Sequence, residues 1–209
     1  MYPYTCELAS TRFTTQTYDE NMNYRDENGQ NPVYGSPKQV RDKYPTGLPM
    51  YVAEMNNELN RVEGIGLIYN RICYDQRYRI YKNMNYNRYA YKGKYWIGRE
   101  QLLDIAPHLM ANLERVLFKG LSNQKRLSGI SVITKNLLDK WDLNLREMKK
   151  DVRRCFIKVH KIDETCHSGN NKRILFVPRR ELQEDENISK ISKISKISKI
   201  SKISDKYIE

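Results

Sequence analysis

The densest functional signal in the sequence lies between Arg71 and Arg99. This stretch carries eight Lys and Arg side chains with Asp75 as its one acid, and eight aromatic side chains are interleaved with them. Guanidinium and ammonium groups neutralise phosphates, while aromatic faces stack on bases. The combination predicts contact with a nucleic acid. The residues that we assign to this candidate surface are Arg77, Arg79, Lys82, Arg88, Tyr89, Tyr91, Lys92, Lys94 and Trp96.

A solvated sheet is the alternative explanation of the same pattern. In a strand, Arg77, Arg79 and Tyr81 would share one face and Tyr78 and Ile80 the other, which gives a basic face over an apolar one. Tyrosines at such positions commonly half-bury their rings and leave their hydroxyls in water. The charge excess favours the nucleic-acid interpretation, and the pattern alone leaves both open.

The loop between Gly120 and Gly129 is a second candidate for anion contact. It holds Lys125 and Arg126 among short polar side chains, between two glycines. This composition suits a phosphate, although the loop lacks the Gly-Lys-Ser/Thr pattern of a nucleotide-binding loop. A plain connection between a helix and a strand explains it equally well. We include Lys125 and Arg126 in the predicted interface.

Catalysis has little support in the residue types. Glu54, Glu58 and Glu63 surround one expected hairpin, but no nucleophile, base or lysine accompanies them in a known pattern. Zinc-ligand residue types occur later in the chain, in the order Cys155, His160, Cys166 and His167, at a spacing that matches no familiar zinc finger. We therefore expect no catalytic activity, no metal and no cofactor. A metal-dependent nuclease is the enzyme alternative.

Charge is distributed unevenly along the 209 residues, whose formal net charge is +12. Residues 61–180 hold 26 basic and 11 acidic side chains, whereas residues 1–60 hold 5 basic and 8 acidic ones. A basic folded region indicates an anionic partner, and nucleic acid, either DNA or RNA, is the partner that we expect.

Cellular location is inferred from the cysteines and the apolar runs. The sequence has no apolar run long enough for a membrane span and no secretory signal, so we expect neither a membrane partner nor secretion. Four widely spaced cysteines favour a reducing compartment, meaning a host cytoplasm or nucleus, or a virus particle.

The expected fold is an α+β domain over residues 45–180 with a small curled antiparallel sheet or barrel and two or three packed helices. Strands are predicted at 50–55, 61–69, 78–81, 87–91, 94–97, 155–159 and 173–177, with the 87–97 segment forming a hairpin that turns at Lys92-Gly93. Helices are predicted at 106–117 and 134–148, and the cations from Arg146 to Arg154 are attributed to the favourable C-terminal end of the second helix.

The two ends of the chain have a different composition. Residues 1–44 are polar and rich in turn residues, which predicts an irregular arm. Residues 181–209 contain Ile-Ser-Lys repeats from Ile188 onward. A three-residue period builds neither a helical stripe nor one face of a strand, so a disordered tail is expected.

The order of the expected elements resembles that of PUA-like folds. The strand pair Met50–Met55 and Gly64–Ile68, the Tyr- and Trp-rich hairpin and the following helix carry this resemblance over about residues 48–135. The EVE and ASCH groups of these folds are small curled barrels that bind RNA or modified bases, so the resemblance implies a base pocket lined by aromatic side chains. The Asn-, Ile-, Lys- and Tyr-rich composition also resembles that of uncharacterised proteins of large A/T-rich DNA viruses.

These observations lead to one principal expectation and two alternatives for function. We expect a non-enzymatic nucleic-acid-binding module that uses the basic, tyrosine-rich sheet region. The first alternative is a PUA-like reader of a modified or flipped base. The second is a structural or scaffold protein of a virus particle.

Overall fold

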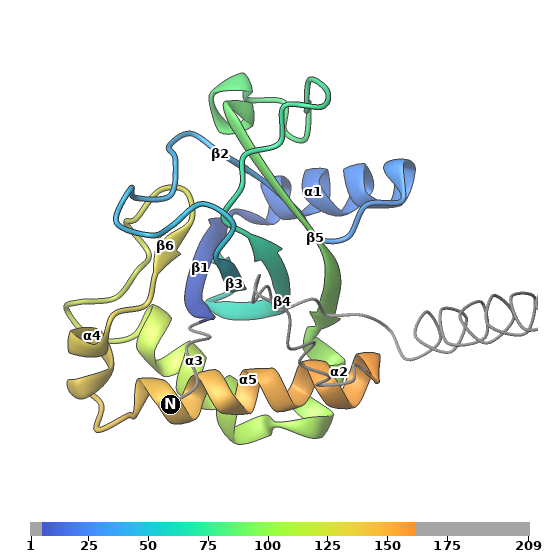
Figure 1. The fold of residues 1–209 in the computed structure, drawn as a ribbon. Helices are drawn as coiled ribbons and strands as arrows, with labels where there is room; N and C mark the ends of the chain where they lie inside the picture. The colour runs from blue at the N-terminus through green and yellow to red at the C-terminus, as the bar shows by residue number, and fades with distance from the viewer. Residues whose placement is uncertain (1–5, 162–209) are drawn as a thin grey trace, which may run out of the picture. The chain divides into compact units, whose positions relative to one another are not determined.

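The computed structural model describes residues 6–161, and residues up to Val159 form one compact unit. The fold is α+β: a curled six-stranded sheet forms a half-barrel, with helices packed around it (Figure 1). The strands are β1 (Glu7–Phe13), β2 (Val33–Ser36), β3 (Pro49–Asn56), β4 (Arg61–Tyr69), β5 (Tyr89–Gly98) and β6 (Ser131–Val132). The helices are α1 (Thr15–Asn28), the short 3-10 helix η1 (Met84–Asn87), α2 (Arg99–Ile105), α3 (Pro107–Phe118), α4 (Lys135–Asp139) and α5 (Leu145–His160).

The sheet is mixed, with the strand order β2-β5-β4-β3-β1-β6. Strands β1 and β3 run parallel, with Glu7 opposite Met50, and the other paired strands of the described region run antiparallel. The predicted β3–β4 hairpin is present. Gly64 and Gly66 are close-approach positions in β4; a Cβ on Gly64, for example, would lie 2.8 Å from the carbonyl oxygen of Ile97.

The N-terminal segment is not the irregular arm that its composition predicts. Strand β1 lies inside the sheet, and α1 follows it directly. Thr14 and Thr17 form a reciprocal capping box at the start of α1, and Gly29 ends the helix at a φ of 59°. The buried side chains of α1 are Asn21 and Arg25. A helix that buries polar groups has no apolar stripe, so the hydrophobic pattern gave no sign of it.

The β5 segment is one continuous strand, and the predicted hairpin turn at Gly93 is wrong. The register between β4 and β5 shifts beside Gly93, where Ile68 is its partner. A Cβ at Gly93 would clash with the carbonyl oxygen of Leu67, so glycine permits an irregularity within the sheet rather than a turn.

The predicted strand at 78–81 is also absent. The N–H groups of Ile80 and Tyr81 donate to Oδ1 of Asn87, at 3.1 and 3.0 Å, instead of to a neighbouring strand. One asparagine side chain thus replaces the hydrogen bonds of a sheet ladder. The burial alternates as expected for the arginines, because Tyr78 and Ile80 are buried while Arg77 and Arg79 are exposed.

The helical part of the prediction is correct for α3 and wrong further along. The predicted helix at 134–148 is divided between α4 and α5, and the predicted strand at 155–159 belongs to α5. Asn144 begins α5 by accepting hydrogen bonds from the N–H groups of Arg146 and Glu147, at 2.9 and 3.2 Å. Phe156 packs on Tyr51 of β3 with ring centroids 5.1 Å apart, which anchors α5 to the sheet.

Two sequence predictions fall outside the described residues. These are the strand at 173–177 and the repeat tail at 181–209. Within residues 6–161, the longest apolar helical stretch falls short of what a bilayer crossing requires.

Candidate nucleic-acid interface

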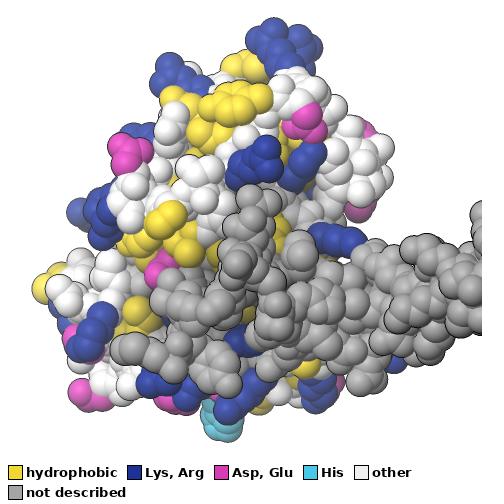
Figure 2. All heavy atoms as spheres, viewed as in Figure 1, with side chains coloured by type: hydrophobic (Ala, Val, Ile, Leu, Met, Phe, Trp, Pro, Cys, Tyr) yellow, Lys and Arg dark blue, Asp and Glu magenta, His cyan; other side chains and the backbone are white. Residues whose placement is uncertain are grey.

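Four of the predicted cations lie on one projecting part of the molecule. Arg77, Arg79, Lys82 and Arg88 are exposed in the chain between β4 and β5, which forms the upper end of the view in Figure 1. Figure 2 shows Lys and Arg side chains at this end, with hydrophobic side chains and some acids among them. On the face shown in Figure 2, the upper end of the molecule is therefore not uniformly cationic.

The predicted aromatic residues of β5 are largely occupied inside the fold. Tyr91 is 1% exposed, and its hydroxyl accepts a hydrogen bond from the N–H of Val40 at 3.1 Å. The half-buried Trp96 donates its indole N–H to Oε1 of Glu54 at 3.0 Å. Tyr89 is half-buried at the start of the strand. The ring of Tyr91 is not accessible to a base, and its role is to position the segment around Val40.

The predicted lysines of β5 differ in their surroundings. Lys92 forms an ion pair with Asp75 at 2.6 Å, and its Nζ lies 5.9 Å from the centroid of the Tyr78 ring. The hydrogen bond to Asp75 raises the pKa of Lys92, and the same bond lowers the pKa of Asp75. Lys94 is exposed. Lys92 is therefore a cation whose charge is already largely balanced by a neighbour.

Lys125 and Arg126 lie beside the ends of β1 and the β3–β4 turn. The carbonyl oxygen of Lys125 accepts hydrogen bonds from Arg12 and from the Asn57 amide, both at 2.9 Å, and its Nζ donates to Oδ1 of Asn60 at 2.7 Å. Arg126 is exposed. These hydrogen bonds fix the loop to the sheet.

A wide hollow lies between the β2–β3 connection and the chain that follows β4. Its volume is about 900 Å³. Tyr74 lines it with 80% of its surface exposed, and Tyr44 and Tyr69 line it as half-buried residues. Arg71 and Lys92 contribute cations, and Asp42 and Asp75 contribute acids. Three tyrosine rings and two cations therefore border a single groove.

A second hollow of about 350 Å³ adjoins the first, because Val40 and Tyr44 line both. Its cationic lining residues are Arg41, Lys43 and Lys140, and none of the described residues that line it is an acid. Lys43 places its Nζ 5.0 Å from the centroid of the Tyr44 ring. We call the two adjoining hollows together the Tyr44 groove.

Side chains from distant parts of the chain hold residues 40–45, which lie between the two hollows of the Tyr44 groove. Asn70 donates from its amide to the carbonyl oxygens of Tyr44 and Pro45, at 2.8 and 3.1 Å. Tyr91 holds Val40 from the other side. The groove brings the 71–92 region into one surface with Ser122 and Asn123 of the predicted phosphate loop, although not with Lys125 or Arg126.

Sequence reasoning missed Arg41, Lys43 and Tyr44. They stand close together in the sequence, with one acid between the two cations, and this short basic and aromatic run was the available signal. The acid excess of residues 1–60 hid it, because a segment-wide charge balance averages over a local run.

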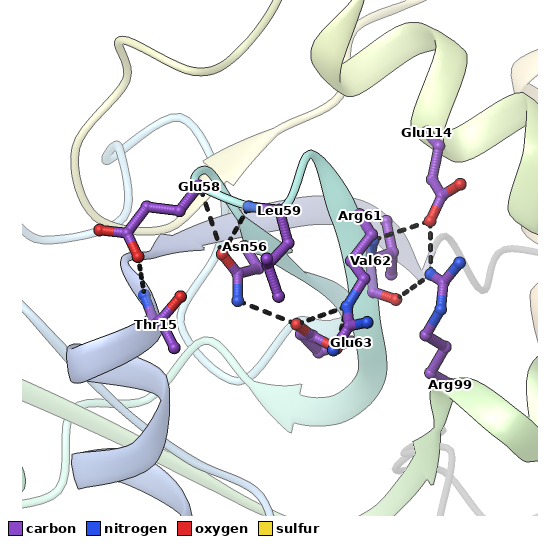
Figure 3. A network of polar contacts seen from close by, with 9 residues as sticks. All are labelled: Thr15, Asn56, Glu58, Leu59, Arg61, Val62, Glu63, Arg99 and Glu114. Carbon is purple, nitrogen blue, oxygen red and sulfur yellow. Dashed lines mark hydrogen bonds and ion pairs between the residues drawn. The ribbon is translucent and has the colours of Figure 1, made fainter.

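The carboxylates considered for catalysis are held apart by separate partners. Glu63 accepts hydrogen bonds from Asn56 and Arg61, and Glu58 accepts one from the backbone N–H of Thr15 (Figure 3). Within residues 6–161, no group of three or more His, Cys, Asp and Glu side chains is arranged to hold a metal ion.

Glu54 belongs to a buried ion pair between α1 and the sheet. Its Oε1 lies 2.6 Å from Nη2 of Arg25, accepts a hydrogen bond from Tyr34 at 2.7 Å, and accepts the Trp96 bond described above. Burial and the Glu54 charge raise the pKa of Tyr34, so its hydroxyl stays protonated as a donor. Burial opposes the charge of Arg25, but Glu54 outweighs this effect and the pKa of Arg25 is raised.

A third hollow, of about 160 Å³, lies at the C-terminal end of β1. It is bordered by Phe13, Tyr81 and Tyr86, and the two tyrosine rings meet edge to face with centroids 6.1 Å apart. Asn57 also lines it, and the Oδ1 atom of this residue is buried with no hydrogen-bond partner among the described residues.

Comparison with known proteins yields no relative. No protein-family model, no curated protein and no solved structure matches the chain. The resemblance to PUA-like folds therefore remains a prediction from element order.

Proposed function

We propose that this protein is a non-enzymatic module that binds single-stranded nucleic acid in the Tyr44 groove. The observation that carries the proposal is Tyr74, which is 80% exposed in a groove bordered by two further tyrosines and by cations. The exposed face of its ring is available to stack on a flat partner. Unpaired bases supply the matching flat surface.

The cations of the groove support a strand rather than a single small ligand. Arg41, Lys43 and Lys140 border one hollow, and Arg71 borders the other, on either side of Tyr44. Successive phosphates of a strand that crosses Tyr44 would meet cations in both hollows. A duplex would not expose its bases to the tyrosines, so the single-stranded form fits better.

The expected magnitudes follow from these residues. Each base stacked on an aromatic side chain contributes about 1–3 kcal/mol, so Tyr74→Ala is expected to weaken binding by roughly tenfold. If Arg41, Lys43, Arg71 and Lys140 each neutralise one phosphate, the logarithm of affinity falls with the logarithm of salt concentration with a slope of about −3.

Fluorescence anisotropy with labelled single-stranded DNA and RNA tests this proposal. Tyr74→Ala and the pair Arg41→Gln with Lys43→Gln should each weaken binding, and the charge variant alone should flatten the salt slope. Arg126→Gln is the matched control, because Arg126 is exposed but borders none of the three hollows. Equal loss in the control, or a salt-independent affinity, would contradict the proposal.

The projecting arginines provide a second comparison. If Arg77→Ala with Arg79→Ala abolishes binding while the groove variants do not, the interface is the upper end of the molecule instead of the groove. Both sets of variants are at exposed or partly exposed positions, so a loss of affinity is interpretable once thermal melting shows an unchanged fold.

A reader of a single base is the second candidate function, favoured by the third hollow. Its three aromatic side chains and the unpartnered Oδ1 of Asn57 would suit one flat heterocycle that carries a hydrogen-bond donor. A preference of more than tenfold for oligonucleotides with a modified base, lost in Tyr86→Ala, is the expected result. Equal affinity for modified and plain strands would refute it.

A further inference from the structure

The cations of α5 do not have the ordinary explanation that the sequence suggests. The helix begins at Leu145, so Arg146, Lys149 and Lys150 lie in its first two turns. The positive end of the helix dipole is there, and it disfavours cations. The attribution of this cluster to a helix C-terminus is therefore wrong for these three residues. Lys149 forms an ion pair with Glu7 of β1 at 2.8 Å, which accounts for its position. The exposed Arg146 and Lys150 call for another reason.

The orientation of α5 gives these cations a common face. Met148, Val152, Cys155 and Phe156 are buried beneath the helix. Arg146, Lys150, Arg153 and Arg154 are exposed and are spaced three or four residues apart, so they lie on the opposite side. We call these four residues the α5 ridge. Figure 2 shows Lys and Arg side chains, with some Asp and Glu among them, along the lower part of the molecule, where α5, α2 and α3 run in Figure 1.

Two residues of the α5 ridge form ion pairs with acids of the same helix. Lys150 pairs with Glu147 and Arg154 pairs with Asp151, both at 2.8 Å and both between exposed side chains. Such surface pairs contribute little and open readily to a competing anion. Six basic and two acidic residues occur between Leu145 and His160, so the helix keeps a positive charge.

We propose that the α5 ridge binds the phosphate backbone of the same nucleic-acid strand where the strand leaves the Tyr44 groove. This inference rests on the proposed function. Lys140, which borders the groove, precedes Arg146 by six residues, so their Cα atoms are at most about 22 Å apart. The two cationic surfaces are near enough for one strand to span both.

An anionic membrane surface fits the ridge less well than a phosphate polymer. A helix that lies in a membrane inserts its apolar face between the lipids. The apolar face of α5 is already buried, with Phe156 against Tyr51, so only its charged face is available. Charge complementarity with a polyanion is the interaction that remains.

The test compares two lengths of single strand, about 6 and about 20 nucleotides, within and beyond the usual range of single-strand site sizes. Arg146→Gln with Lys150→Gln should weaken binding of the long strand about fivefold or more and make its salt slope shallower by about 1.4, because two phosphate contacts are lost. Binding of the short strand, which the groove alone holds, should not change.

Two further variants keep the result interpretable. Arg146→Lys with Lys150→Arg retains the charge and should bind the long strand like the unaltered protein. Lys119→Gln removes one exposed cation outside the ridge and should leave both affinities within twofold.

The outcomes separate this inference from the function on which it rests. If the unaltered protein binds neither strand, the proposed function fails and the ridge inference fails with it. If it binds both strands and the ridge variant affects neither, or affects both equally, the ridge inference alone is overturned. Anionic vesicles that compete for the ridge as strongly as the long strand would also overturn it.

Discussion

Replacement of Glu54 by glutamine distinguishes a structural carboxylate from a catalytic one. The side chain of Glu54 is fully buried, and that of Arg25 is 1% exposed. Glu54→Gln keeps the size of the side chain but leaves the guanidinium of Arg25 as an unpaired buried cation. The loss of one partner from such a pair costs about 3–5 kcal/mol.

The same reasoning gives the magnitude of the thermal effect. For a domain of this size, each kcal/mol lowers the melting temperature by roughly 2–4 °C, so Glu54→Gln is expected to lower it by about 6–20 °C. The double variant Glu54→Gln with Arg25→Met removes both charges. It should recover much of the loss, because no buried charge is then left without a partner.

Differential scanning calorimetry and urea unfolding of the single and double variants measure these effects. Glu54→Asn is an unsuitable substitute for comparison because it also creates a cavity, whereas Glu58→Gln alters an exposed carboxylate and is the appropriate control. Two results would refute the reasoning. One is a loss of unfolding free energy below about 1 kcal/mol in Glu54→Gln. The other is a loss in the double variant that equals or exceeds the sum of the losses in the two single variants. A metal-dependent hydrolysis of nucleic acid that disappears in Glu54→Gln at unchanged stability would instead support a nuclease.

Three other predictions concern single positions. Cys73 lines the Tyr44 groove, and burial raises the pKa of its thiol. Alkylation of Cys73 by iodoacetamide at pH 8 should therefore be slower than that of a free cysteine, and bound oligonucleotide should slow it further. Mass spectrometry measures both rates. An unchanged rate at saturating oligonucleotide would place the strand elsewhere. Asn144→Ala removes the cap of α5 and should lower the free energy of unfolding by about 1 kcal/mol, whereas Asn144→Ser should retain most of it. Gly66→Ala would press a Cβ against the hydroxyl of Tyr34 in β2 and bring it to 2.7 Å from Cγ of Pro32, so we expect a loss of about 1–3 kcal/mol in urea unfolding. A neutral result would show that β2 shifts freely.

The elements that the sequence predicted correctly bury apolar side chains at a regular period. Helix α3 buries Leu109, Leu113 and Val116, and the β3–β4 hairpin has apolar strands separated by a polar turn. Helix α1 could not be found in this way, because it is held by Arg25 and Asn21 through contacts with residues far along the chain. The partner of a buried polar group is a property of the folded chain and leaves no local period.

The candidate site was predictable to a similar extent. Charge counting located the region that includes Arg71, Tyr74 and Lys92, and these residues border the Tyr44 groove. The opposite wall depends on Tyr44. Its carbonyl oxygen accepts a hydrogen bond from Asn70, and the nearby Val40 donates its N–H to the Tyr91 hydroxyl. Bonds between segments 26 and 51 residues apart are not encoded in any local pattern.

The tyrosines show why composition alone could not identify the interface. Tyr34, Tyr81 and Tyr91 are buried, and their hydroxyls bond to Glu54, Asn21 and Val40, so these rings stabilise the fold. Tyr74 differs from them in exposure and not in type or sequence neighbourhood. A tyrosine ring is useful to a ligand only if the fold leaves its face in solvent, and the fold decides this through hydroxyl partners that lie far away in the sequence. The rings that border the Tyr44 groove, rather than the number of tyrosines near the basic residues, are therefore the physical basis for expecting a base-stacking partner.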